Sequence, residues 1–193
     1  MILATVFHPD LPVDYKQLAS EIRAKGPNRP HTLLAICRPE DESETAEWVF
    51  NLSDCFTRHY MGVTLADGNS PLHLSNMMFQ TACRFLKAYK PEAHEPEGVP
   101  LVYLNPTWRP VGKRWMDILQ GEFFMNGAPQ VMRNGDSQGA VVIGKKYPET
   151  SILLDQVPEN QHWRNYLTWE MQRNAVETPL LGELVKPRPV KTP

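Results

Sequence analysis

Hydrophobic and polar residues alternate along the chain in blocks of two kinds. Short apolar runs, typical of buried strands, are separated by longer segments in which apolar residues recur every three or four positions, as on one face of a helix. Four such strand–helix pairs follow one another up to Phe123. The expected strands span residues 2–7, 31–37, 59–66 and 101–104.

The expected helices are marked by their boundaries as well as by their apolar faces. Gly26 stands where the first helix should end, and the acidic run from Glu40 to Glu44 favours the start of the second. Ser70 and Pro71 have the residue types of an N-cap and a first helical position, so a third helix is expected from there to about Tyr89. The apolar faces are expected to hold Tyr15, Leu18, Ala19 and Ile22 in the first helix, Ala46, Val49, Phe50 and Cys55 in the second, Leu74, Met78, Ala82 and Phe85 in the third, and Trp115, Ile118, Leu119 and Phe123 in the fourth.

The pattern changes after Gly127. Residues 129–133 and 139–147 have the character of two further strands around a polar turn, and residues 162–174 follow helical spacing. The segment 177–193 is rich in proline and lacks periodicity, so it is expected to form a tail without regular structure. The alternation predicts an α/β fold, a mostly parallel Rossmann-like sheet with helices on both faces and late antiparallel strands. The predicted organisation is a single domain over residues 1–176, followed by the tail.

Composition narrows the class of protein. A chain of 193 residues with 41% hydrophobic residues and a net charge of −2 can bury one core, and it is neither a disordered tail nor a strongly cationic nucleic-acid binder. Its cysteines, Cys37, Cys55 and Cys83, are odd in number and far apart, which argues against a disulfide framework or a zinc knuckle. No apolar run reaches the roughly 18 to 20 residues of a membrane span, and no signal peptide is indicated. These features predict a cytoplasmic protein without a membrane partner.

Several common catalytic motifs are absent from the sequence. It has no GxGxxG after the first strand, no GxxxxGKS/T and no GxSxG, which disfavours dinucleotide-dependent, P-loop and hydrolase chemistry. His94 and His162 have carboxylates nearby in sequence, but no pair of histidines has metal-ligand spacing such as HExxH. The histidines therefore predict no metal site.

Polar residues follow the end of each expected strand. His8, Arg38, Asp67 and the pair Asn105 and Thr107 all stand at such ends. Because the carboxyl ends of parallel strands share one edge of an α/β sheet, and ligands bind at that edge, these side chains are expected to converge on one ligand. The competing interpretation is that Asp67 and Asn105 are only turn residues.

Four segments, taken in order, carry a resemblance to a known family. They are "SPLHLSNMMFQTACRFLKAY", "PLVYLNPTWRPVGKRWMDILQGEFF", "VVIGKKYP" and "HWRNYLTWEM". The chain resembles the nucleotide-sugar glycosyltransferases of the GT-A fold, particularly small phage-type and bacterial members. In that family the long helix carries an Asn followed by an apolar pair, matched here by Asn76-Met77-Met78. The next strand ends in a D-x-D-like motif followed by a proline and a helix, matched in outline by residues 104–119, and a later strand is matched by Val142–Pro148.

The resemblance implies a GT-A-like fold, a nucleotide-sugar donor and a binding role for Asn76. The Asn76 side chain is expected to point toward the end of the fourth strand, because Leu74, Met78 and Ala82 should take the opposite contacts.

The chain departs from the family where the fourth strand ends. The family places carboxylates there, and they hold a divalent cation against the donor diphosphate. This chain has Asn105 and Thr107 instead, whose neutral oxygens can touch a phosphate or a weakly held Mn²⁺ or Mg²⁺. No tightly bound metal is therefore expected.

Other residues would then have to replace the metal and supply a base. Arg109, Lys113 or Arg114 would pair with the diphosphate of the leaving group. Glu170 or Asp155, in the segment that resembles the family's acceptor side, would act as the base of an inverting reaction.

Three functions stay open at this point. The first is a glycosyltransferase that binds a nucleotide-sugar and works without a tightly bound metal. The second is a non-catalytic relative that keeps the scaffold as a binding or virion-associated module, which the neutral motif favours. The third is a nucleic-acid-binding accessory protein, which requires one basic face made of Lys113, Arg114, Arg133, Lys145 and Lys146. The sugar, the nucleotide base and the acceptor are not indicated.

Overall fold

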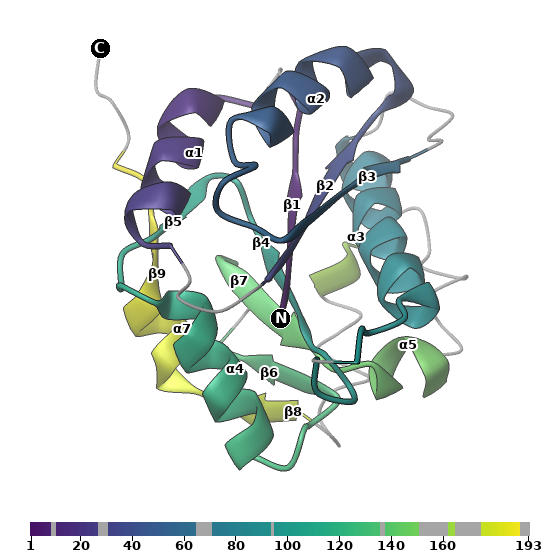
Figure 1. Ribbon diagram of the computed structural model, residues 1–193, viewed down its shortest axis with the longest axis vertical. Coiled ribbons are helices and arrows are strands. Elements are labelled where there is room, and N and C mark those ends of the chain that lie inside the picture. Colours follow the sequence, from purple (N-terminus) through teal and green to yellow (C-terminus); the bar gives the residue numbers. More distant parts are fainter. Residues whose placement is uncertain are drawn as a thin grey trace.

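A seven-stranded sheet forms the centre of the computed structural model (Figure 1), which describes residues 1–8, 11–26, 31–64, 71–93, 95–135, 138–150, 162–164 and 175–189. Its strand order is β3-β2-β1-β4-β7-β6-β8, and a second small sheet pairs β5 with β9. The strands are β1 (Ile2–Val6), β2 (Thr32–Cys37), β3 (Arg58–Val63), β4 (Leu101–Leu104), β5 (Trp108–Pro110), β6 (Val131–Arg133), β7 (Ala140–Ile143), β8 (Ala175–Glu177) and β9 (Val185–Pro187). The helices are α1 (Tyr15–Ala24), η1 (Pro39–Asp41), α2 (Glu42–Phe50), α3 (Pro71–Ala88), α4 (Trp115–Met125), α5 (Lys146–Thr150) and α7 (Pro179–Leu184).

The first four strands run parallel, which confirms the predicted α/β class. Ala4 of β1 pairs with Leu34 of β2 on one side and with Tyr103 of β4 on the other, and β3 continues the sheet beside β2. The late strand β7 is antiparallel to both β4 and β6, also as predicted. The carboxyl ends of β1 to β4 therefore share one edge of the sheet (the carboxyl edge), and Met1 lies at the opposite edge (the amino edge).

Helices cover both faces of the sheet because its strands are apolar on both sides. On one face, α1, α2, α4 and α7 bury residues such as Leu18, Trp48 and Trp115 against alternate positions of the strands. On the other face, α3 and α5 do the same with residues such as Phe79 and Tyr147. Figure 1 shows α1 and α4 on one side of the sheet and α3 and α5 on the other. Each fully buried large apolar side chain contributes about 1.5 to 3 kcal/mol, so these two clusters hold the layers together.

The C-terminal segment has regular structure, so the expectation of an unstructured tail is wrong. Thr178 caps α7 by accepting a hydrogen bond of 3.3 Å from the Leu180 backbone N–H, and Pro179 occupies the first helical position. The following strand β9 is antiparallel to β5, in the register Arg109↔Lys186. Proline is tolerated at the first position of a helix and on an edge strand, and the prolines of α7 and β9 occupy such positions. A high proline content therefore did not prevent regular structure here. The division of the chain at residue 176 stays a prediction.

Two large apolar side chains expected in helix faces are exposed instead, and so is Ala46 of α2. Phe50 is 76% exposed and Ile118 is 41% exposed, whereas Trp48 and Trp115 are buried. In α2 the 3₁₀ turn η1 precedes the helix and sets which residues face the sheet. The predicted helix at residues 162–174 is described only at residues 163–164, which are helical, and Ser70 lies outside the described residues. Within the described ranges, no helix combines the length and the apolar character needed to cross a bilayer.

Candidate functional site

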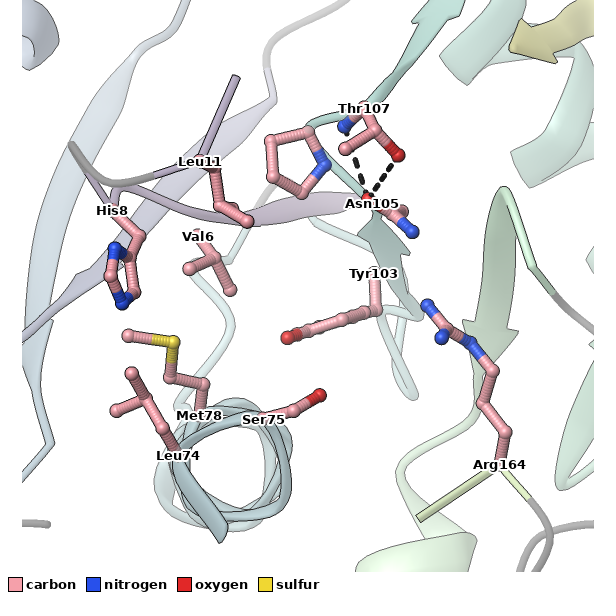
Figure 2. Close-up of a pocket in the computed structure, with 11 residues that line it drawn as sticks. Val6, His8, Leu11, Leu74, Ser75, Met78, Tyr103, Asn105, Thr107 and Arg164 are labelled. Atoms are coloured by element: carbon pink, nitrogen blue, oxygen red, sulfur yellow. Dashed lines mark hydrogen bonds between the residues drawn. The ribbon is translucent and has the colours of Figure 1, made fainter. Parts of the chain in front are cut away.

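A pocket of about 250 Å³ opens at the carboxyl edge, between the ends of β1 and β4 and the helix α3. The elements that form it come from four distant parts of the chain, as Figure 2 shows. Its lining consists of Val6, His8, Leu11, Leu74, Ser75, Met78, Tyr103, Asn105, Pro106, Thr107 and Arg164. Three residues expected to converge there, His8, Asn105 and Thr107, do line this one pocket.

The loop after β1 is fixed so that His8 stays at the pocket. The backbone N–H of His8 donates to Tyr15 Oη at 2.9 Å, and Tyr15 Oη donates back to the His8 carbonyl at 3.1 Å. Burial raises the pKa of Tyr15 to about 12, so this phenol stays neutral and keeps its proton for the hydrogen bond. The loop conformation therefore depends on α1, on which Tyr15 is the first residue.

Asn105 forms a compact turn at the end of β4. Its Oδ1 accepts hydrogen bonds from the backbone N–H of Thr107 at 3.0 Å and from Thr107 Oγ1 at 2.8 Å. Its Nδ2 donates to the Gln138 carbonyl at 3.0 Å. Asn105 thus acts as a turn residue and also lines the pocket, so the two interpretations of this position are compatible.

This turn does not fit a tightly bound divalent cation. Mg²⁺ and Mn²⁺ favour carboxylate oxygens, and Asn105 Oδ1 already accepts two hydrogen bonds. Among the residues that the structure describes, no three His, Cys, Asp or Glu side chains gather closely enough to hold a metal.

Ser75 presents a hydrogen-bond donor to the pocket. Its Oγ accepts from Trp163 Nε1 at 3.2 Å and lies 3.2 Å from His162 Nε2. His162 Nδ1 accepts from the Arg164 backbone N–H at 3.1 Å, and His162 Nε2 lies 3.4 Å from Arg164 Nη1. Burial, followed by the charge of Arg164, lowers the pKa of His162 to about 4 and keeps the ring neutral. Ser75 Oγ therefore accepts from Trp163, and its hydroxyl lines the pocket beside a neutral imidazole.

Tyr103 and Arg164 add two further polar groups. The Tyr103 hydroxyl points into the middle of the pocket (Figure 2), and no described residue forms a hydrogen bond with it. Burial raises the pKa of this phenol. The Arg164 side chain reaches from the far side of the pocket toward Tyr103 and Asn105, and its Nη2 lies 3.4 Å from the Gln138 carbonyl. The pocket therefore offers mostly donors, together with one positive charge, above an aliphatic floor.

Asn76 is buried next to this pocket but does not line it. Its Oδ1 accepts a hydrogen bond of 2.8 Å from the Trp163 backbone N–H. The prediction assumed that Leu74 and Met78 face away from the end of the fourth strand. That assumption is wrong, because both residues line the pocket. Asn76 instead holds the segment that carries Arg164.

The predicted cations lie elsewhere. Arg109 faces Glu21 of α1, with 3.8 Å between Nη1 and Oε1, and Arg38 is paired with Asp41 at 2.7 Å. Neither is among the residues lining the pocket. These two arginines therefore do not converge on the pocket as expected, because each is paired with a carboxylate elsewhere.

Arg114 lies at the amino edge, on the other side of the molecule from the pocket. Its backbone N–H donates to the carbonyl of Lys25, at the end of α1, and its Nε contacts Asp117 at 3.3 Å. Asp117 in turn contacts His31, which immediately precedes β2. The expectation that Arg114 or its exposed neighbour Lys113 meets a ligand at the carboxyl edge is therefore wrong, because β5 carries the chain back along α1 before α4 begins.

Three predicted residues fall outside the described part of the chain: Asp67, Asp155 and Glu170. Three polar lining residues were missed by sequence reasoning: Ser75, Tyr103 and Arg164. Tyr103 carried a signal, since its hydroxyl is the only polar side-chain group in the apolar run 101–104. Arg164 fell within the helix expected at residues 162–174, and nothing in the sequence tied that helix to β4.

The basic face required for nucleic-acid binding does not form from the expected residues. Arg133 pairs with Glu177 at 2.7 Å near the carboxyl edge. Lys145 follows β7 at the amino edge, where its Nζ donates to the Tyr89 carbonyl at 3.0 Å. Arg133 therefore lies at the opposite edge of the sheet from Lys145 and Arg114, so the five expected cations do not share one edge.

Solved structures share this fold at low sequence identity. The galactosyltransferase LgtC in complex with donor and acceptor sugar analogs matches with a TM-score of 0.55 and 11% identity over 90% of this chain and 67% of that chain. An active-site mutant of LgtC matches with a TM-score of 0.62 and 11% identity, over 92% and 72% of the two chains. The 4-diphosphocytidyl-2C-methyl-D-erythritol synthase from Anaerococcus prevotii matches with a TM-score of 0.52 and 9% identity, over 92% and 86%. No protein-family model matches the sequence, and no curated protein does either.

These likenesses show that the chain has a GT-A-like fold, as the sequence motifs predicted. They give no support to the expected phage type.

Proposed function

We propose that this protein binds a nucleotide-sugar in the pocket at the carboxyl edge and transfers the sugar without a tightly bound divalent cation. The observation that carries the proposal is the donor-rich wall of the pocket, made by Ser75, Tyr103 and Arg164 above aliphatic residues. A diphosphate offers acceptors and negative charge to such a wall, and a base or sugar ring offers apolar surface to its floor. The GT-A-like fold and the position at the carboxyl edge agree with this assignment.

Arg164 takes the place that the sequence had given to Arg109, Lys113 or Arg114. A guanidinium at the leaving diphosphate would stabilise the charge that develops there, which a metal does in other enzymes. Asp155 and Glu170 remain the proposed bases. A cytoplasmic location belongs to the same proposal, and the three free cysteines are compatible with a reducing compartment.

A binding protein without catalytic activity is the second candidate. It is favoured by one observation: none of the described residues that line the pocket is a carboxylate, so the described wall offers no carboxylate base. Both candidates share the ligand and differ only in turnover. A nucleic-acid-binding role is not proposed, because Arg133 lies apart from Lys145 and each of the two is already engaged within the fold, by Glu177 and by the Tyr89 carbonyl.

The test is a thermal-shift series with UDP, GDP, ADP, CMP and their sugars, each with Mn²⁺ and with EDTA. A ligand at 100 times its dissociation constant should add about 2.7 kcal/mol to the free energy of unfolding. Stabilisation that survives EDTA supports binding without metal, and release of free nucleotide from a nucleotide-sugar separates the enzyme from the binding protein. If no compound in the panel raises the melting temperature, the proposed ligand class is wrong.

A further inference from the structure

A second pocket of about 250 Å³ lies on the other side of the turn that follows β4. The residues of its lining that matter most are Trp108, Asn134, Gln138, Gly139, Leu181 and Gly182. Gln138 and Gly139 are also the residues that Asn105 holds, through its Nδ2 at 3.0 Å and its backbone N–H at 2.9 Å. The Asn105 turn is therefore a wall shared by the first pocket and the second.

Two glycines allow larger side chains to form this second pocket. A Cβ at Gly139 would collide with the indole of Trp108, and a Cβ at Gly182 would collide with the amide of Asn134. The Trp108 indole thus packs on the backbone of Gly139, and the Asn134 amide packs on that of Gly182. This close packing leaves the second pocket open beside both side chains. None of the described lining residues carries a charge.

We propose that the second pocket binds a neutral pyranose ring. Such a ring has apolar C–H faces, which suit the indole of Trp108 and the side chain of Leu181, and hydroxyl edges, which suit the amide of Asn134 and exposed backbone groups. The inference extends the proposed function, since a saccharide here would be separated from a nucleotide-sugar only by the Asn105 turn.

Other ligand classes fit the described lining less well. A purely apolar ligand would desolvate the Asn134 amide without giving it a partner, which is unfavourable. An anionic ligand would enter a space in which no described lining residue is a cation. A neutral ligand with both apolar and hydroxyl surfaces has neither cost.

The test uses saturation-transfer NMR and titration with methyl glycosides of glucose, galactose and N-acetylglucosamine, with and without UDP. Methyl glucuronide serves as the charged comparison and sorbitol as the acyclic one. At least one neutral glycoside should bind, with both comparison compounds about tenfold weaker, a factor that corresponds to about 1.4 kcal/mol. Binding of sorbitol or methyl glucuronide as tight as that of the best neutral glycoside would overturn the assignment to a neutral pyranose.

Gly182→Ala is the decisive variant, because the added methyl group should push the Asn134 amide into the pocket and weaken glycoside binding by about tenfold or more. Gly121→Ala is its matched control, since Gly121 is also helical and a Cβ there meets no atom within 4 Å. The control should bind the glycoside as the wild type does. Trp108→Ala should reduce binding to a similar extent.

The outcome does not depend on the nucleotide assays. Gly182→Ala should leave stabilisation by nucleotide unchanged, because Gly182 does not line the first pocket. If no glycoside binds the wild type under either condition, or if Gly182→Ala and Trp108→Ala both bind it normally, the second site is refuted, whether or not nucleotides bind. If glycosides bind as expected and nucleotides do not, the second site stands and the proposed function fails.

Discussion

The backbone N–H of Trp163 donates a hydrogen bond of 2.8 Å to Oδ1 of Asn76, which lies 87 residues earlier in the chain. Asn76 is 3% exposed, and the Trp163 ring stacks on Phe79 of α3 with 4.0 Å between the ring centroids. This anchor fastens residues 162–164 to α3, and the next residue is the arginine that reaches the pocket. The position of Arg164 therefore depends on a buried amide that does not itself line the pocket.

Replacing Asn76 by Ala should lower both stability and ligand binding. The buried Trp163 N–H would lose its partner, which costs about 1 to 3 kcal/mol of unfolding free energy. Nucleotide affinity should fall as well, because Arg164 loses its anchor. Urea denaturation and calorimetry measure the two effects. Asn126→Ala is a control, since the Asn126 amide is exposed and donates only to the Glu122 carbonyl; an equal loss of affinity in that variant would contradict the anchoring role.

Arg164→Met should weaken nucleotide binding by about 1.5 to 3 kcal/mol, the usual contribution of a hydrogen bond to a charged group. The matched control is Lys113→Met, because Lys113 is an exposed cation in the segment next to the amino edge. The control should bind the nucleotide as tightly as the wild type. The reverse result, with binding lost only in Lys113→Met, would restore the role that the sequence suggested for the basic segment before α4.

Two tyrosines allow stability to be separated from binding. Tyr103→Phe removes a hydroxyl that has no hydrogen-bond partner in the described structure, so the free energy of unfolding should change by less than about 0.5 kcal/mol while nucleotide affinity drops about tenfold. Tyr89→Phe removes a hydroxyl at the amino edge that contacts Thr32 Oγ1 at 3.0 Å and Glu95 Oε1 at 3.0 Å. That variant should lose about 1 kcal/mol or more of stability and keep its affinity. If Tyr103→Phe binds the nucleotide normally, its hydroxyl is not a ligand contact.

The sequence was sufficient to predict the sheet but not the path of the chain around it. The four parallel strands are continuous apolar runs buried on both faces, and this pattern together with the intervening helices allows few topologies. The small strand β5 has no such pattern, so its residues were not predicted to form a strand. Strand β5 pairs with β9 and runs beside α1, and this path brings Arg114 to the amino edge. Contacts between segments so far apart in sequence leave no pattern in the residues of β5 itself.

The candidate site was predicted in part for the same reason. His8, Asn105 and Thr107 follow strands, so the sheet topology alone brings them together. Ser75 reaches the pocket because α3 packs on the sheet, and Arg164 reaches it through the Asn76–Trp163 hydrogen bond and aromatic stacking. Those contacts join segments far apart in sequence, and the helical spacing of residues 162–174 gave no indication of a partner.

His162 should make the protein less stable in mild acid. Its pKa is lowered from 6.5 to about 4 in the folded protein, so between these values the unfolded chain binds a proton that the folded chain does not. Stability is therefore lost as the pH falls from 6.5 toward 4, and this loss levels off below the folded pKa. Thermal unfolding of the wild type and His162→Gln across this range measures the effect. The variant should show a shallower dependence on pH, and identical slopes would mean that folding does not lower the pKa of His162.

Arg188 should link the C-terminal segment to the first pocket. Its Nε donates to the Pro106 carbonyl at 3.1 Å and its backbone N–H donates to the Thr107 carbonyl at 3.0 Å, so it holds the turn that lines the pocket. Its Nη2 also lies 2.7 Å from Oε2 of Glu21, and both side chains are largely buried.

Arg188→Met would leave the Pro106 carbonyl and Glu21 without this cation. Glu21 would keep the hydrogen bond from Gln17 Nε2 at 3.1 Å and the longer contact with Arg109, but it would lose its nearest cation. We therefore expect a loss of about 2 to 4 kcal/mol in unfolding free energy, because a largely buried carboxylate loses its ion-pair partner. Lys186→Met, on the exposed side of β9, is the matched control and should lose less than about 0.5 kcal/mol. Hydrogen exchange at the Trp108 amide, which bonds to the Asn105 carbonyl, should accelerate in Arg188→Met alone. Equal exchange in both variants would show that β9 packs against β5 without holding the pocket turn.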